Sequence, residues 1–128
     1  HFELPTVPHD LERLRQIELI PFRKAIEAGV AAIMTAHIML PAIDPDRPAT
    51  LSRRIVTGLL REELGFEGTI FADDLEMHAI AKRWGIAEAA EMAIEAGCDV
   101  APVCGMAHRA WLRTAPGEDI HRDVRGRR

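Results

Sequence analysis

Apolar positions along the chain form two kinds of pattern, and these patterns alternate three times. Stretches in which apolar residues recur every three or four positions are typical of helices with one buried face, and short unbroken apolar runs are typical of buried strands. The predicted helices cover residues 11–18, 22–28, 55–64 and 86–96, and the predicted strands cover residues 30–34, 69–72 and 99–103. Pro102 weakens the last strand, because proline cannot donate a ladder hydrogen bond.

The ends of the predicted helices carry residues that commonly start or stop a helix. Asp10 can cap the first helix, and Thr50 or Ser52 can cap the one that contains residues 55–64. Pro21 either kinks the first helical stretch or starts its second segment. Three helices are followed by a glycine, namely Gly29, Gly65 and Gly97. The proline-rich loop at 41–48 separates the first strand from the next helix, and its aspartates are expected to stabilise it.

Helices that alternate with fully apolar strands predict an α/β fold with parallel strands covered by helices. Gly29 and Gly65 are 36 residues apart, and Gly65 and Gly97 are 32 residues apart. This spacing of helix ends suits the αβ units of a (β/α)8 barrel. Three such units cannot close a barrel. The pattern therefore leaves two interpretations, a small open sheet or a piece of a larger TIM-type barrel with one sheet edge uncovered.

Composition narrows the function classes without choosing among enzymes. The 128 residues suit one domain, and 48% hydrophobic with 28% charged residues is the balance of a globular protein. The net charge of −4 argues against nucleic acid as the main partner, and no apolar run approaches the roughly 20 residues that span a bilayer. The two cysteines, Cys98 and Cys104, indicate neither a disulfide framework nor a zinc site.

The candidate chemistry lies where the predicted strands end, because reactive groups of parallel α/β folds gather there. Asp73 and Asp74 directly follow the second strand, where a carboxylate would be held rigidly. On spacing alone, a capping role toward the segment 75–84 is as well supported as a chemical one, and we expect Asp74 to cap and Asp73 to react. His37 ends the first strand, where an isolated histidine is more often a buried core residue. Met77 fits the core or a pocket wall.

The residues around Asp73 resemble a known family. Four segments carry the resemblance: GFEGTIFADDLEM at 65–77, MTAHIMLPAIDPDRPATLS at 34–52, LLREELGF at 59–66 and EAGCD at 95–99. Together they are similar to the nucleophile region of glycoside hydrolase family 3, in the form typical of bacterial β-N-acetylglucosaminidases (β-N-acetylhexosaminidases of the NagZ type). The resemblance implies that residues 1–104 are the C-terminal part of the catalytic barrel. It fades over residues 105–128, an Arg-rich, divergent tail for which disorder is one interpretation.

The resemblance also implies roles for individual residues. Asp73 matches the aspartate that attacks the anomeric carbon. His1, followed by Phe-Glu-Leu-Pro, matches the histidine of a mobile Asp-Ser-His loop that acts as acid/base. We name His37 and Met77 as candidate substrate-binding residues. The family's sugar-binding segment Lys-His-Phe-Pro-Gly-His-Gly does not occur in the chain.

The implied reaction is retaining hydrolysis of terminal β-linked N-acetylglucosamine, without metal or cofactor. The expected substrates are N-acetylglucosamine-containing peptidoglycan (muropeptide) fragments, handled in the bacterial cytoplasm during cell-wall recycling. A phosphorylase of the same family is the nearest alternative. From another class, a receiver-like signalling domain would use the acid pair to bind Mg²⁺, but it would need that pair at the first strand. A third expectation is that this segment alone is inactive. The sequence does not specify an oligomeric state.

Overall fold

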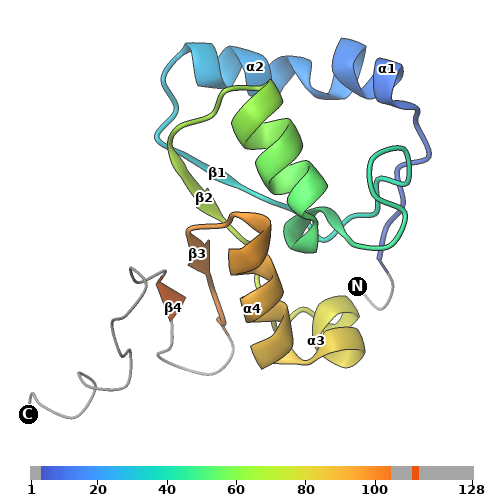
Figure 1. Ribbon diagram of the computed structural model, residues 1–128, viewed down its shortest axis with the longest axis vertical. Coiled ribbons are helices and arrows are strands. Elements are labelled where there is room, and N and C mark those ends of the chain that lie inside the picture. The colour runs from blue at the N-terminus through green and yellow to red at the C-terminus, as the bar shows by residue number, and fades with distance from the viewer. Residues whose placement is uncertain (1–3, 105–110, 113–128) are drawn as a thin grey trace, which may run out of the picture.

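The computed structural model describes residues 4–104 and 111–112 of the chain. Helices and strands alternate along it, as the hydrophobic pattern predicts (Figure 1). The elements in chain order are α1 (Leu11–Arg13), η1 (Leu14–Glu18), α2 (Ile20–Glu27), β1 (Ala32–Met34), η2 (Ala49–Leu51), η3 (Arg54–Glu63), β2 (Thr69–Phe71), α3 (His78–Trp84), α4 (Ile86–Ala96), β3 (Val100–Ala101) and β4 (Trp111–Leu112). No helix within the described ranges has both the length and the hydrophobicity needed to cross a membrane.

The strands form one sheet in the order β1-β2-β3-β4. The first three are parallel, with Ile33 opposite Ile70 and Phe71 opposite Val100. The predicted α/β class with parallel strands is therefore confirmed. The fourth strand pairs antiparallel with β3, which the repeating αβ pattern did not predict. Three parallel strands do not close a barrel, so the interpretation of this sheet as part of a TIM-type barrel stays a prediction.

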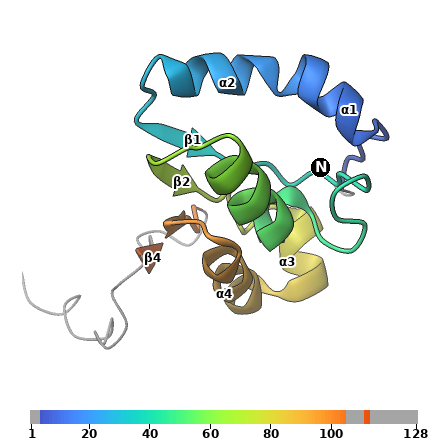
Figure 2. The same ribbon diagram turned by 45° about the horizontal axis from the view of Figure 1, so that its top comes forward.

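Helices η3 and α4 lie next to each other against the strands, while the segment from α1 to α2 runs across the β1 side at the top of both views (Figures 1 and 2). The main core forms where η3 and α4 meet the sheet. Ile70 of β2 is fully buried there, together with Val56 of η3 and Ala93 of α4. Small alanines on α4 let this helix approach η3 and the sheet closely. This core fixes the position of β2, which leads to the acid pair.

The helix ends follow the predicted capping chemistry. The Asp10 carboxylate accepts the Arg13 amide at 2.8 Å, and the Ser52 hydroxyl accepts the Ile55 amide at 3.3 Å, so Ser52 rather than Thr50 caps the second helical unit. That helix, η3, has the wider π-type turn instead of the regular α-helix that the stripe predicted. Pro21 lies in the first turn of α2 and so starts a second segment. Gly97 ends α4 with a φ of 116°, a conformation that strains any side-chain-bearing residue.

Strand β1 is more exposed than its apolar sequence predicted. Met34 is 60% exposed and Ala32 is also exposed, because β1 is the edge strand of the sheet. An apolar cavity of about 190 Å³ lies between Phe22 of α2, Ile33 of β1 and Leu59 of η3. The expected uncovered edge is therefore present, and the expectation that β1 is buried was wrong for this segment. Hydrophobicity alone predicts a buried strand, whereas burial also needs a neighbour on both sides.

Candidate active site at the carboxyl ends of the strands

Asp73 is placed by the end of β2. The strand ends at Phe71, and the amide of the fully buried Ala72 donates to the carbonyl of Val100 at 2.8 Å. On the other side, the Thr35 amide donates to the Phe71 carbonyl at 2.8 Å. The backbone immediately before Asp73 is thus held by both neighbouring strands. Asp73 itself is half-buried, so its side chain is packed on a fixed backbone but retains contact with solvent.

The Asp73 carboxylate is oriented by its own neighbour. Its Oδ1 accepts the backbone amide of Asp74 at 2.8 Å. This bond favours one side-chain rotamer for Asp73 and does not use the other oxygen, Oδ2. A carboxylate with one oriented and one available oxygen can act as a nucleophile or as an acceptor for a ligand hydroxyl.

Asp74 accepts one amide of the segment 75–84, as expected, but it is not the N-cap of the helix in that segment. Helix α3 begins only at His78, and its N-cap Met77 makes no side-chain capping bond. The Asp74 Oδ1 instead accepts the amides of Glu76 at 3.1 Å and Cys104 at 3.2 Å. The carboxylate closes a turn and ties the end of β2 to the segment after β3. A capping pattern cannot reveal this, because the Cys104 amide is 30 residues away along the chain.

His37 meets the acid pair from the end of the first strand. Its side chain is only 4% exposed, and its Nε2 lies 2.9 Å from the carbonyl oxygen of Asp74. The same carbonyl also accepts the Met77 amide at 3.1 Å. The other ring nitrogen, Nδ1, is buried and has no hydrogen-bond partner among the described residues. The two sequence-predicted strand ends, His37 and the acid pair, therefore do come together.

The carboxylates of Asp73, Asp74 and Glu76 make this edge of the sheet acidic, and they surround the Cys104 thiol. Met77 is half-buried beside the turn, and the thiol of Cys104 is exposed. Partial desolvation, and then the carboxylates of Asp74, Glu76 and Asp73, raise the pKa of the Cys104 thiol above its ordinary value. The carboxylate contributions to this shift show that negative charge gathers at this edge of the sheet.

His1 lies outside the described residues, so its position relative to Asp73 is not part of the structure. Within residues 4–104 and 111–112, no group of three or more His, Cys, Asp or Glu side chains is arranged to hold a metal ion.

Arg61 and Asp99 are structural residues that the sequence analysis did not single out. The Arg61 guanidinium contacts the Asp99 carboxylate at 2.6 Å and also donates to two backbone carbonyls before β2. The Asp99 Oδ2 accepts the amide of Ile70 at 2.8 Å. Asp99 thereby completes the hydrogen bonding between β2 and the start of β3. In the sequence, the position of Asp99 directly before a strand indicates a structural role for Asp99. The sequence does not indicate its partner, because Arg61 lies 38 residues earlier in the chain.

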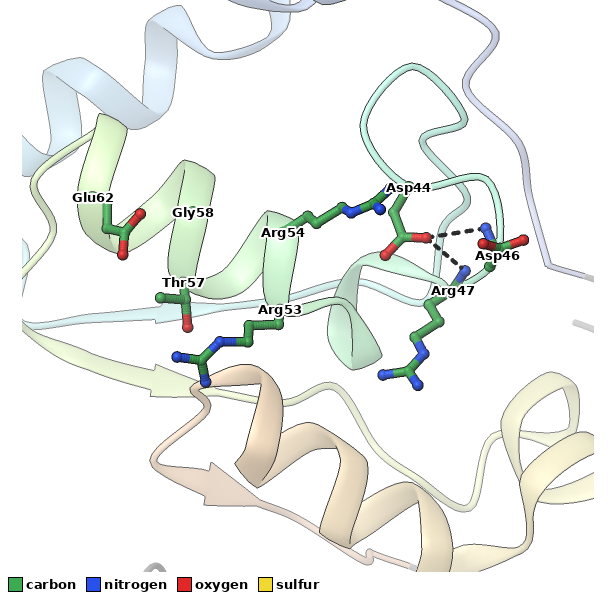
Figure 3. A pocket seen from close by; sticks show the side chains of 8 residues that line it. All are labelled: Asp44, Asp46, Arg47, Arg53, Arg54, Thr57, Gly58 and Glu62. Carbon is green, nitrogen blue, oxygen red and sulfur yellow. Dashed lines mark hydrogen bonds between the residues drawn. The ribbon is translucent and has the colours of Figure 1, made fainter.

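A polar pocket of about 510 Å³ opens between η3 and the proline-rich loop (Figure 3). Asp44 shapes this loop, since its Oδ1 accepts the amides of Asp46 and Arg47 and its Oδ2 accepts the Ser52 hydroxyl. Burial opposes ionisation of Asp44, but these hydrogen bonds outweigh it and lower the carboxyl pKa. The expectation that an aspartate stabilises the loop is confirmed for Asp44. Arg53 and Arg54 of the pocket wall point to other backbone carbonyls, and no residue of the Asp73 edge lines this pocket.

Comparison with known proteins places the chain in one enzyme family. The family described as "Glycosyl hydrolase family 3 N terminal domain" matches residues 1–113. A beta-hexosaminidase of Alkalilimnicola ehrlichii is 41% identical over 127 residues, which cover 98% of this chain and 36% of that protein. Both matches extend beyond residue 104. The chain spans about a third of the length of the curated relatives that it matches.

Solved structures give the same result. A glycoside hydrolase family 3 beta-N-acetylglucosaminidase from Paenibacillus sp. FPU-7 superposes with a TM-score of 0.78 at 54% identity, over 80% of this chain and 20% of that one. Native NagZ from Neisseria gonorrhoeae superposes with a TM-score of 0.73 at 40% identity, over 82% of this chain and 29% of that one.

Proposed function

The chain belongs to glycosyl hydrolase family 3, and from this membership we propose that it is a segment of an enzyme that hydrolyses terminal β-linked N-acetylglucosamine residues. The relatives are named beta-hexosaminidases and beta-N-acetylglucosaminidases, which supports the sugar specificity. The receiver-like alternative has no support among these relatives. A phosphorylase remains the alternative within the family, and it differs from a hydrolase in requiring inorganic phosphate.

The observation that carries the proposal is the placement of Asp73. Its carboxylate follows a parallel strand held on both sides, with one oxygen oriented by the Asp74 amide. Rigid placement of a nucleophile supplies a large share of catalytic rate, because the entropy of alignment is lost before the reaction begins. The superposition of two related enzymes over 80% and 82% of the chain is consistent with this proposal.

The proposed reaction has two displacement steps. First, an Asp73 oxygen bonds to the anomeric carbon while the bond from that carbon to the leaving oxygen breaks, and His1 gives the leaving oxygen a proton. Second, His1 removes a proton from water, the water oxygen bonds to the anomeric carbon, and the bond to Asp73 breaks. Two inversions retain the β configuration. A histidine suits both proton transfers, because an unperturbed imidazole titrates near neutral pH.

The finer assignments are part of the same proposal. His37 and Met77 are proposed to border the sugar site, since one contacts the Asp74 carbonyl by its side chain and the other by its backbone. The proposed natural substrates are N-acetylglucosamine-containing muropeptide fragments, met in the bacterial cytoplasm during cell-wall recycling. The sequence resemblance around Asp73 supports this choice. Its test is release of N-acetylglucosamine from purified muropeptides.

The nucleophile assignment is tested with two matched variants of the full-length enzyme. Asp73→Asn should lower cleavage of an aryl β-N-acetylglucosaminide by roughly a thousandfold or more, because the amide is a poor nucleophile. Asp74→Asn keeps an acceptor oxygen for the Glu76 and Cys104 amides and should lose far less, mainly through stability. Wild-type turnover by the Asp73 variant would refute the assignment. Rapid quenching and mass spectrometry should find the N-acetylglucosaminyl adduct on the peptide that contains Asp73.

Two further measurements define the activity. Turnover with and without inorganic phosphate separates hydrolysis, which gives N-acetylglucosamine in both conditions, from phosphorolysis, which gives the sugar 1-phosphate. The isolated segment is expected to be inactive, because β1 is an exposed edge and the family's sugar-binding segment is not in the chain. Measurable turnover by the isolated segment would contradict that expectation.

A further inference from the structure

We propose that His37 is a positioning residue for the nucleophile: its ring donates to the Asp74 carbonyl and so holds the residue that orients the Asp73 carboxylate. This inference rests on the proposed function, because it assigns a role within the same reaction. It does not require that His37 contacts the sugar.

The direction of the His37 hydrogen bond follows from its partner. A carbonyl oxygen has no proton, so the ring nitrogen 2.9 Å away must carry one. The structure therefore assigns the Nε2–H tautomer to His37. The buried Nδ1, with no partner among the described residues, then presents a lone pair rather than an unpaired N–H group.

Asp74 is held from three parts of the fold. Its Oδ1 accepts the Cys104 amide from the segment after β3, and the Glu76 amide closes the local turn. The His37 ring supplies the contact from the segment after β1, across 37 positions of sequence. Without that contact, Asp74 remains tied to its own turn and to β3 but not to β1.

The link from Asp74 to Asp73 is short. The Asp74 amide donates to the Asp73 Oδ1 at 2.8 Å, so a rotation of Asp74 moves the donor that fixes the carboxylate. Small misplacements of a reacting group matter, since an error of about 1 Å can lower a rate by about a hundredfold. The effect of His37 should therefore appear in kcat, with little change in the affinity for the sugar.

Two substitutions of the full-length enzyme test this role. In His37→Gln the amide nitrogen can reach the place of the ring Nε2, whereas in His37→Asn the shorter side chain reaches only the place of Nδ1. Both variants are polar and smaller than histidine, so they serve as matched controls for packing. We expect His37→Asn to lower kcat on an aryl β-N-acetylglucosaminide by about ten- to a hundredfold with KM within about twofold. We expect His37→Gln to recover most of the loss.

Melting temperatures and tautomer state complete the test. Similar melting temperatures for the two variants together with different kcat values would support the positioning role. Equal kcat losses in both variants, kcat losses that follow the melting temperatures, or a rise in KM alone would overturn the positioning role. Nitrogen-15 NMR of the wild type should show a protonated Nε2 on His37, and an Nδ1–H tautomer would also overturn it. An active Asp73→Asn variant would refute the proposed function, whereas an inert Asp73→Asn with a wild-type-like His37→Asn would refute only this inference.

Discussion

Replacing Asp99 by alanine should destabilise the protein by about 2–4 kcal/mol. In the folded structure the Asp99 Oδ2 accepts both the Arg61 guanidinium at 2.6 Å and the amide of Ile70 at 2.8 Å. Ile70 is fully buried, so its amide would have no water to replace the lost acceptor. The substitution thus removes one charged and one backbone hydrogen bond at the start of β3.

The magnitude comes from those two losses. An unsatisfied buried N–H group costs about 1–3 kcal/mol, and the charged hydrogen bond to Arg61 adds about 1 kcal/mol. The charged contribution is reduced because the Arg61 and Asp99 side chains are 24% and 31% exposed and water screens them. Asp99→Asn keeps one oxygen for the Ile70 amide, so it should cost about 1 kcal/mol.

Urea unfolding of the purified protein, followed by circular dichroism, measures these differences. Glu91→Ala is the matched control, because Glu91 is exposed on α4 and its truncation should change stability by less than about 0.5 kcal/mol. Equal midpoints for Asp99→Ala and Glu91→Ala would show that Asp99 does not connect β2 to β3. An Asp99→Asn variant as unstable as Asp99→Ala would show that the charge, and not the Ile70 amide, carries the effect.

Two other predictions follow from local geometry. Gly68→Ala should be more destabilising than Gly65→Ala, because a Cβ at Gly68 would lie 2.5 Å from the Ala31 carbonyl oxygen. A Cβ at Gly65 meets nothing within 4 Å, so that variant has only the backbone strain of a φ of 69°. Equal melting temperatures for the two variants would contradict this prediction. Iodoacetamide at pH 8 should label Cys104 slowly, because this thiol is exposed but its pKa is raised. Cys98 should be labelled only after unfolding, because burial shields its thiol and raises the thiol pKa to about 12. Labelling of Cys98 in the native protein, detected by peptide mass spectrometry, would contradict the burial argument.

The sequence by itself determined the elements whose causes are local. Helix α4 covers the predicted residues 86–96, because its apolar spacing and Gly97 both act within a few positions of each helix end. The short apolar run before Asp73 formed β2 for the same reason. Spacing alone supported capping and chemistry equally for the acid pair, and the family resemblance matched Asp73 to the nucleophile.

Tertiary structure decided what depends on partners far along the chain. β1 is apolar yet exposed, because burial of a strand depends on neighbours and not on its own sequence. Asp74 has the residue type of a helix cap, but its carboxylate accepts the Cys104 amide from the segment after β3. Its backbone carbonyl contacts the His37 ring from the segment after β1. A hydrogen bond between residues that are 30 or 37 positions apart leaves no periodic trace in sequence. Only the parallel pairing of strands, which brings their carboxyl ends to one edge, makes such contacts and the candidate active site.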